Sequence, residues 1–463
     1  MNKRFAILGA GISGLSAAIY LSRKGHNVVV FEKENDTGGL AGGKIINGNI
    51  YEYGPHFFHT NNPEILSEIK KIAGDELIKF ERTILIKFMD EYFVYPLSII
   101  EVLKKLPKKI VFHAIASLFK NNFLRFFNNG KEKNSETILL GFYGRILYEL
   151  FFKNYIYHVW GIYPDKFSEE FAKERIPNIF ASIFLNKIFA PIRLRFSKKN
   201  RGDFIENVDG QLFTTSMGYR GIIKKMENEV YKNGGKILLN SEIKNIYIKN
   251  NHISAISYKI PDDGLCKDRF DGYISTIPVN ETIFYLCPKI NNEILESAKY
   301  LEYRAIVFVG ILVNKPRVLP VSFMYFREHS FNRIYDSSYF SHDTVLPDTT
   351  ILVAEISSSG NDLWWKNDNY CINEVLKDIV REKIIDRKDV LEINVYRYRH
   401  GYPIYKLGYE KHMKKILDFI DGIKNLETAG RQGLFKYVNG HIAIKMGFDA
   451  AKKLEKNIQQ KTI

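Results

Sequence analysis

The chain has 463 residues, of which 45% are hydrophobic and 26% charged, and its formal net charge at neutral pH is +15. Its 28 Tyr and 33 Phe exclude a largely disordered chain, and its 32 Gly, which follow no three-residue period, exclude a collagen-like one. The length predicts two or three folding units rather than one.

The number and spacing of the cysteines and the N-terminal segment indicate the cellular compartment of the protein. The three cysteines, Cys266, Cys287 and Cys371, lie far apart and form no Cys-X-X-Cys pair. This spacing excludes a disulfide framework and a thiolate zinc site, so we expect no metal centre. Met1 leads directly into a strand pattern without a secretory leader, and no stretch of 18 apolar residues is free of charge. We therefore expect a cytoplasmic protein without a spanning helix.

The excess positive charge is concentrated in two stretches, residues 103–131 and 175–202. Each contains seven Lys or Arg and no acid, and each is rich in Phe, Ile and Leu. A basic amphipathic segment is typical of contact with an anionic membrane surface or a polyanionic substrate. The competing interpretation is a solvated basic face on helices that pack elsewhere. We keep peripheral contact with the inner face of the membrane as a hypothesis, and we expect no nucleic-acid partner because no binding module accompanies the charge.

A strand, a glycine-rich turn and a helix open the sequence. The apolar run 5–8 leads into the motif Gly9-Ala-Gly-Ile-Ser-Gly14, and a helical pattern follows it. A second buried strand, 27–31, ends at Glu32. A Gly-X-Gly-X-X-Gly motif between strand and helix, with an acid closing the next strand, indicates a dinucleotide-binding unit. A glycine-rich turn without a ligand is the weaker interpretation.

Each position of this motif has a separate expected role. Gly9 and Gly11 let the backbone turn tightly and approach a pyrophosphate, whose charge the helix N-terminus favours. Gly14 allows the helix to pack closely on the strand, and Glu32 can accept hydrogen bonds from the ribose hydroxyls. The remaining expected contacts with the dinucleotide in this part of the chain come from Ile12, Ser13 and Lys33.

A second glycine pair, Gly38-Gly39, follows the ribose-binding acid and precedes Leu40. This arrangement resembles the FAD-binding proteins of the glutathione-reductase-2 type, which include amine oxidases, protoporphyrinogen oxidase, phytoene desaturases and UDP-galactopyranose mutase. The resemblance implies that FAD is the cofactor, that Gly39 and Leu40 lie in a loop that wraps it, and that the flavin is buried between domains.

The rest of the chain predicts an α/β protein with a discontinuous Rossmann-like FAD-binding domain, an inserted helical domain and an antiparallel β-sheet domain. The apolar spacing is mostly helical from about 98 to 190, and alternation favours strands elsewhere. The expected strands are 83–97 (a hairpin), 237–258, 271–278, 305–313, 323–326, 350–356 and 390–398, with a strand, loop and helix over 426–454. The expected domains are 1–82 with 205–280 and 400–463 (FAD), 98–204 (helical), and 83–97 with 281–399 (sheet).

Four segments resemble UDP-galactopyranose mutase in the same order. In the first, 53–61, the resemblance implies that His56 and Phe57 contact the flavin and that His56 contributes to catalysis. In the second, 151–177, it implies substrate contacts of three aromatic residues and of Arg175 on a lid. The aromatic residues are Phe152, Tyr155 and Trp160. Flat apolar faces suit a base and a guanidinium suits a diphosphate. Taken alone, the aromatic cluster is more typical of a helical core.

The third and fourth segments are 331–335 and 401–440. In the third, the resemblance implies that Arg333 is the second catalytic arginine, although an arginine among strands is usually a surface residue. In the fourth, Tyr402 and Tyr437 correspond to tyrosines that bind substrate phosphate. The expected flavin contacts of this segment are Arg431, Val438 and Asn439. Many bacterial mutases carry Asp where Asn439 stands, and this chain is longer than theirs.

The resemblance favours a flavin-dependent mutase that interconverts pyranose and furanose forms of a nucleoside-diphosphate sugar for surface glycan biosynthesis. Such an enzyme needs reduced FAD, and NAD(P)H is a candidate reductant. The alternative is an FAD-dependent oxidoreductase of the amine oxidase or desaturase type, acting on a sugar, an amine or a polyprenyl substrate. A flavoprotein scaffold without activity is the weakest alternative, and a homodimer is a candidate assembly.

Overall fold

The structure is a computed structural model, and it describes most of the chain. The described residues are 2–79, 81, 83–88, 90–95, 101, 104–114, 116–117, 134–176, 211–261, 264–288, 290–341 and 346–460. The basic stretch 175–202 therefore lies outside the described residues except for its first two positions, and much of 103–131 does too.

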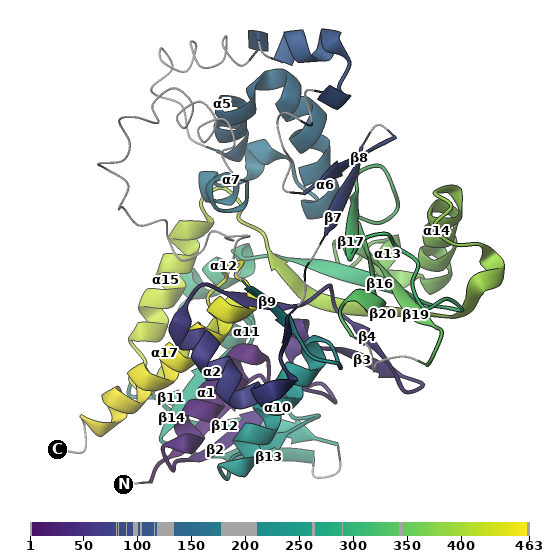
Figure 1. The fold of residues 1–463 in the computed structure, drawn as a ribbon. Helices are drawn as coiled ribbons and strands as arrows, with labels where there is room; N and C mark the ends of the chain where they lie inside the picture. The colour runs from purple at the N-terminus through teal and green to yellow at the C-terminus, as the bar shows by residue number, and fades with distance from the viewer. Residues whose placement is uncertain are drawn as a thin grey trace, which may run out of the picture.

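Five parallel strands form the sheet that carries the glycine-rich turn (Figure 1). Their order across the sheet is β10-β2-β1-β14-β21, and each neighbouring pair is parallel. Their bounds are β1 Arg4–Leu8, β2 Asn27–Phe31, β10 Lys236–Leu238, β14 Gly272–Ser275 and β21 Leu426–Thr428. Segments from both ends of the chain thus meet in one sheet, and β14 is the strand expected over 271–278. A parallel sheet covered on both faces confirms the α/β fold class.

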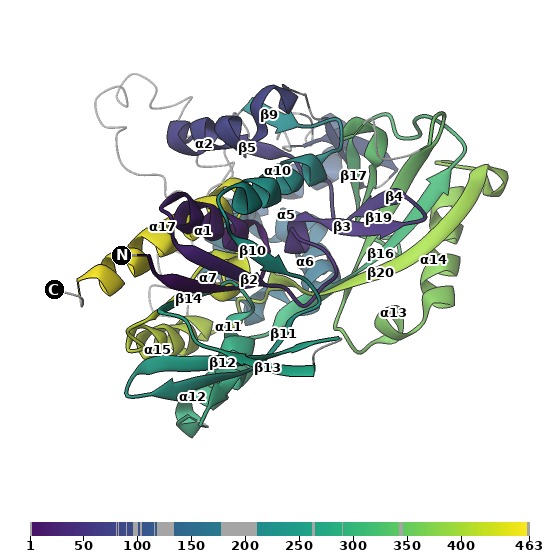
Figure 2. The same ribbon diagram turned by 90° about the horizontal axis from the view of Figure 1, so that it is seen from below.

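Helices cover one face of this sheet, as Figure 2 shows for α1, α10 and α17. Their bounds are α1 Ile12–Arg23, α2 Pro63–Ala73, α10 Tyr219–Lys232 and α17 Gly440–Gln459. The hydroxyls of Ser13 and Ser16 donate to carbonyl oxygens of α17 at 2.8 and 2.9 Å. A Cβ at Gly447 would lie 2.1 Å from the Ser13 carbonyl oxygen, so glycine permits this close approach. Helices α1 and α17 are therefore in direct contact next to the glycine turn, through hydrogen bonds and close packing.

A four-stranded sheet covers the opposite face of the parallel sheet. Its order is β13-β12-β11-β15, and Phe31 of β2 packs on Tyr258 of β12 with ring centroids 4.6 Å apart. The bounds are β11 Glu242–Lys249, β12 His252–Ile260, β13 Gly264–Asp268 and β15 Leu286–Cys287. The alternation expected over 237–258 is thereby divided between β10 in one sheet and β11 and β12 in another.

A seven-stranded sheet forms the second large layer, in the order β20-β16-β19-β18-β17-β7-β8. It is antiparallel except where β17 runs parallel to β7. The bounds are β7 Ile84–Phe88, β8 Glu91–Val94, β16 Tyr303–Val313, β17 Phe323–Phe326, β18 Arg333–Asp336, β19 Thr350–Ser358 and β20 Val390–Pro403. The predicted strands are confirmed, and the hairpin expected over 83–97 is β7 with β8. Helix α14, Asp368–Arg381, packs its apolar side on one face of the sheet. The other face is turned toward the cavity.

Helices lie above the β7–β8 edge of this sheet (Figure 1). They are α5 Ser135–Leu147, the π-helical turn η3 Tyr148–Lys153, α6 Asn154–Trp160 and α7 Glu169–Arg175. The helical pattern expected from 98 to 190 is confirmed over this described part. The domain boundaries themselves stay a prediction.

The remaining elements connect these layers. The strands are β3 Gly43–Ile46, β4 Asn49–Glu52, β5 Phe58–Thr60, β6 Ile78–Lys79 and β9 Gln211–Thr214. The α-helices are α11 Val279–Phe284, α12 Asn292–Tyr300, α13 Leu363–Lys366, α15 Tyr409–Asp421 and α16 Gly430–Gly433. The 3₁₀ turns are η1 Gly39–Ala41, η2 Gly74–Glu76, η4 Pro164–Lys166, η5 Ser337–Tyr339 and η6 Arg387–Asp389. Within the described ranges, none of the helices has the length and apolar character needed to span a bilayer.

Candidate functional site

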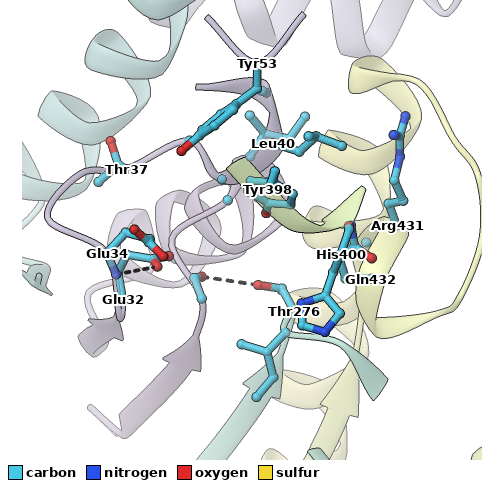
Figure 3. Close-up of a pocket in the computed structure, with 18 of the residues that line it drawn as sticks. Glu32, Glu34, Thr37, Leu40, Tyr53, Thr276, Tyr398, His400, Arg431 and Gln432 are labelled. Atoms are coloured by element: carbon cyan, nitrogen blue, oxygen red, sulfur yellow. Dashed lines mark hydrogen bonds between the residues drawn. The ribbon is translucent and has the colours of Figure 1, made fainter. Parts of the chain in front are cut away.

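A cavity of about 450 Å³ opens at the carboxyl ends of β1 and β2, between the parallel sheet and the seven-stranded sheet (Figure 3). Ligands of open α/β sheets bind at this position. Twelve of the residues expected to hold FAD line it: Gly9, Gly11, Ile12, Ser13, Glu32, Lys33, Gly39, Leu40, His56, Phe57, Arg431 and Val438. Gly14 and Asn439, also expected there, are not in the lining.

The first glycine turn has the backbone geometry that a close ligand approach needs. Gly9 has a φ of +100°, a conformation that side chains rarely adopt. The amide of Gly38 donates to the Ala10 carbonyl at 2.9 Å, so the second glycine pair is attached to the first turn. A Cβ at Gly11 would meet no atom within 4 Å, although Gly11 lines the cavity. Glycine there leaves open space at the N-terminus of α1, where a pyrophosphate would be favoured.

Gly14 is buried, and it packs against the backbone of the glycine turn. A Cβ at this position would lie 2.0 Å from the Gly9 carbonyl oxygen. The residue is therefore required for the contact between α1 and the turn, which is the packing role expected from the sequence, and it stays out of the cavity.

The carboxylate of Glu32 is held by the backbone at the edge of the cavity. Its Oε2 accepts from the Ala10 amide at 2.8 Å. Its Oε1 accepts from the Glu34 amide at 3.0 Å (Figure 3). Burial raises the pKa of Glu32, and the two amide donors oppose that rise. Each oxygen keeps a lone pair that a ribose hydroxyl can approach. Together with the open space at Gly11, this donor and acceptor set fits an FAD molecule.

The C-terminal segment forms the opposite wall. Nε and Nη2 of Arg431 donate to the Val438 carbonyl at 3.1 and 2.6 Å, which closes the loop before α17. Asn439 occupies the N-cap position of α17, but its side chain makes no capping hydrogen bond. The guanidinium thus fixes the backbone of this wall and still lines the cavity.

His56 stands between the cavity and a second group of polar residues. Its Nδ1 is buried and finds no hydrogen-bond partner among the described residues. A Cβ at Gly54 would lie 3.3 Å from Cε1 of His56 and 3.5 Å from Nη2 of Arg333, which brings the two side chains together. Burial, with Arg333 and Arg431 nearby, lowers the pKa of His56 to about 3. The imidazole is therefore neutral at physiological pH.

The lowered pKa of His56 predicts a pH-dependent stability. In the unfolded chain this histidine takes up a proton near pH 6.5, whereas in the folded protein it resists protonation down to about pH 3. The unfolded state thus binds more protons in this window, so stability falls as the pH falls, by up to about 1.4 kcal/mol per pH unit. We expect His56→Gln to lose less Tm than the wild type between pH 7 and pH 5 in scanning calorimetry. Parallel Tm curves for the two proteins would contradict this assignment.

The second group centres on Glu355, which is buried in β19. Nε of Arg333 donates to its Oε2 at 3.1 Å and Nη2 contacts the same oxygen. The Tyr402 hydroxyl donates to its Oε1 at 2.6 Å. Arg333 and Glu355 are register partners on neighbouring strands, so the sheet sets their contact. Binding a phosphate through the Tyr402 hydroxyl, as the resemblance implied, would require this hydroxyl to exchange its partner.

Aromatic rings extend this group toward the cavity. Tyr402 stacks on Tyr437 with ring centroids 5.2 Å apart, and Trp160 packs on Tyr402 at 5.4 Å. The guanidinium carbon of Arg175 lies 3.3 Å from the Tyr437 ring centroid, and that of Arg431 lies 4.3 Å from it. A chain of contacts thus leads from Arg175 and Arg431 through the two tyrosines to Glu355 and Arg333.

Two of the expected substrate residues lie in different surroundings from each other. Tyr155 is half-buried near Tyr325 and Arg333, and desolvation raises its pKa. Phe152 packs on Tyr143 with centroids 4.4 Å apart, on the core side of the helical segment. Tyr155 therefore joins the arginine group, whereas the contacts of Phe152 are those of a helical core.

Sequence reasoning did not identify three residues of the site. Glu355 is the carboxylate that holds Arg333, and its signal is the one acid inside the buried strand Thr350–Ser358, whose other residues are apolar or carry a hydroxyl. Tyr53 and Tyr398 line the cavity beside Leu40 (Figure 3). The Tyr398 hydroxyl comes within 3.6 Å of where a Gly39 Cβ would be. No local sequence pattern marks either tyrosine.

Comparison with known proteins gives one family match and several partial relatives. The model of the family "Flavin containing amine oxidoreductase" matches residues 12–320. A probable UDP-galactopyranose mutase of Klebsiella pneumoniae is 25% identical over 188 residues, 38% of this chain and 45% of that protein. Protoporphyrinogen oxidase 2 of Arabidopsis thaliana is 41% identical over 79 residues, 17% of this chain and 16% of that protein. The chain thus matches less than half the length of these curated relatives.

Solved structures match over nearly the whole chain. A reduced UDP-galactopyranose mutase aligns with a TM-score of 0.80 at 18% identity, covering 98% of this chain and 94% of that one. A protein described as a protoporphyrinogen oxidase of Exiguobacterium sp. 255-15 aligns with a TM-score of 0.71 at 17% identity, covering 98% and 99%. At these identities the likeness establishes the fold.

Proposed function

The chain belongs to the flavin-containing amine oxidoreductase family, and from this premise we propose that it is an FAD-dependent mutase of a nucleoside-diphosphate sugar. The enzyme would interconvert the pyranose and furanose forms of the sugar, as in a UDP-galactopyranose mutase-like reaction. NAD(P)H is the reductant we propose for the flavin.

The observation that carries the proposal is the balance of charge beside the cavity. Arg175, Arg333 and Arg431 lie along one chain of contacts, in which Glu355 is the acid that holds Arg333, and Glu174 lies near Arg175. A site with an excess of guanidinium groups suits a diphosphate, since arginine binds phosphate oxygens through several donors. An amine or a polyprenyl hydrocarbon would gain nothing from these cations.

The residues have distinct tasks in this reaction. Reduced flavin, when bound, supplies the nucleophile for the anomeric carbon of the sugar. Arg175 and Arg333 stabilise the negative charge that develops on the departing diphosphate, and removing one such donor typically costs about 2.7–4 kcal/mol of transition-state stabilisation. Glu355 positions Arg333, whose Nη1 is not used in that contact. Trp160, Tyr402 and Tyr437 exclude water, which strengthens these electrostatic interactions.

The test is to incubate the reduced and the oxidised holoenzyme separately with UDP-galactopyranose and to separate the products by chromatography. We expect a new ring form of the nucleotide sugar only with the reduced protein and no net oxidation of flavin. The alternative function, the runner-up, is a redox enzyme of the desaturase or oxidase type. It is supported by partial relatives that are a desaturase and an oxidase. Flavin oxidised or reduced in proportion to the sugar, amine or polyprenyl substrate would support the runner-up and contradict the mutase.

A further inference from the structure

Arg327, directly after β17, carries buried hydrogen-bond donors that the proposed reaction does not use. Its Nε and Nη1 are buried, and neither finds an acceptor within the part of the chain that the structure describes. Buried donors of native proteins are nearly always paired, and an unpaired charged group is especially costly. These donors therefore call for an acceptor that the described residues do not provide.

The surroundings of Arg327 keep it charged and hold it in place. Its guanidinium carbon lies 4.2 Å from the ring centroid of Phe88 and 5.7 Å from that of Phe151. Burial lowers its pKa to about 10, with Glu328 and Tyr155 opposing the effect, so the group is a cation at neutral pH. Arg304 is half-buried, and its Nε donates to the Val159 carbonyl at 3.1 Å. Among the described residues, Arg304 thus has an internal acceptor, whereas the two buried donors of Arg327 have none.

The position of Arg327 in the sheet relates it to the diphosphate group. Tyr325 of β17 is the register partner of Arg333, and Arg333 is the partner of Glu355. Arg327 directly follows Phe326, the last residue of β17, and Tyr155 lies near both Arg327 and Arg333. In the strand order, β18 with Arg333 lies between β17 and β20, which carries Tyr402, and Arg431 contacts the Tyr437 ring that stacks on Tyr402.

We propose that Arg327 recognises the base of the nucleoside diphosphate by donating to a carbonyl oxygen on its edge. This inference rests on the proposed function and adds a residue that determines which base is accepted. With the flavin cavity and the diphosphate arginines on one side, the nucleoside extends toward β17 and the helical segment. The rings of Phe88 and Phe151 lie against the Arg327 guanidinium and Tyr155 lies near it, and such rings suit a planar base better than another phosphate.

The donor chemistry of Arg327 predicts a preference among bases. Arginine has donors and no acceptor, so it favours carbonyl oxygens such as those of uracil. Both pyrimidines carry O2, but cytosine has an amino group where uracil has O4. Donation by Arg327 to the O4 position therefore distinguishes them, because the amino group would meet the guanidinium donors without forming a hydrogen bond. A site built around buried donors rejects a ligand that leaves them unpaired. The protein should therefore prefer uridine over cytidine diphosphate.

The test measures binding of UDP and CDP to the FAD-loaded protein by calorimetry, because the two probes share the ribose and the diphosphate. We expect the wild type to bind UDP more tightly, and Arg327→Met to weaken UDP binding by about 10- to 100-fold while CDP binding changes far less. Arg317→Met is the matched control: Arg317 stacks on Tyr339 at 4.3 Å, on the exposed surface, and its loss should change neither affinity. If Arg327→Met does not fold, Arg327→Lys replaces it in the test. This variant keeps a cation over Phe88 but loses the planar donors, so it should lose most of the preference for UDP over CDP.

The outcomes separate this inference from the proposed function. Equal weakening of UDP and CDP would overturn it in favour of a contact with phosphate or a packing role, and unchanged binding of both would overturn it in favour of an ordered water. In both cases the wild type still binds nucleotide, so the mutase proposal stands. A wild type that binds neither nucleotide would overturn the mutase proposal and this inference together.

Discussion

Replacing Arg333 with alanine is expected to lower kcat/KM for the nucleotide sugar by about 100-fold or more while the flavin stays bound. The guanidinium is fixed by two contacts with Glu355, so it is preorganised to stabilise charge on the leaving diphosphate. It does not line the flavin cavity, and the visible spectrum of the bound flavin should therefore be unchanged. Steady-state kinetics of the reduced enzyme, with the flavin content measured in the same samples, checks this result. Wild-type kinetics in Arg333→Ala would remove Arg333 from the catalytic group.

Glu355 gives this prediction an internal control. Because its carboxylate acts through Arg333 and Tyr402, Glu355→Gln should reduce kcat/KM by about tenfold, which is less than the arginine variant loses. The double variant should be little worse than Arg333→Ala alone, since residues that act as a unit are not additive. Strictly additive losses would instead show that Glu355 contributes to the reaction independently of Arg333.

The FAD-binding part of the site could be predicted from the sequence because most of the residues that form it lie close together along the chain. The residues from Gly9 to Gly14 form one strand-to-helix turn, and Glu32 ends the adjacent strand. The backbone demands of each position follow from the residue type alone: a positive φ at Gly9, and no room for a Cβ at Gly14. The family resemblance added FAD as the cofactor, and the parallel sheet then followed from the β-α-β pattern.

The substrate half depends on long-range register, which local sequence patterns do not carry. Glu355 meets Arg333 from 22 residues away and Tyr402 from 47 residues away. The resemblance singled out the arginine and the tyrosine, but their shared acid is visible only once β18, β19 and β20 are in place. The parallel pairing of β17 with β7 also joins strands that are far apart in the sequence, so it could not be predicted from local patterns. The contact between Arg327 and Phe88 depends on this pairing and could not be predicted either.

The different surroundings of Phe152 and Tyr155 have a local reason. Residues Tyr148–Lys153 form a π-helical turn between α5 and α6. Such a turn inserts an extra residue into the helical repeat, so the side chains after it face another direction than a continuous α-helix would give them. Phe152 lies within this turn and packs on Tyr143, whereas Tyr155 and Trp160 follow it and reach the arginine group. Apolar spacing alone predicts a helix here but not this shift of its faces.

The open space at Gly11 allows cofactor binding to be tested separately from folding. Gly11→Ala should leave the Tm of the apoprotein nearly unchanged, because the new Cβ meets no atom within 4 Å and the φ of −66° suits alanine. The same methyl group would occupy the space at the N-terminus of α1 where a pyrophosphate approaches. Overpacking of this kind costs about 1–3 kcal/mol, so FAD binding should weaken by about tenfold or more.

Gly14→Ala is the matched control for this change, since both variants add one methyl group to the same turn. Its Cβ would lie 2.0 Å from the Gly9 carbonyl oxygen, so the Tm should fall with and without FAD. Fluorescence titration of the apoproteins with FAD and calorimetry of each form measure both effects. A Gly11→Ala protein that purifies yellow and binds FAD as the wild type does would show that the cofactor does not approach this turn. FAD binding weakened by about tenfold or more, with an unchanged apoprotein Tm, is the expected result, because at Gly11, unlike at Gly14, only a ligand leaves no room for a side chain.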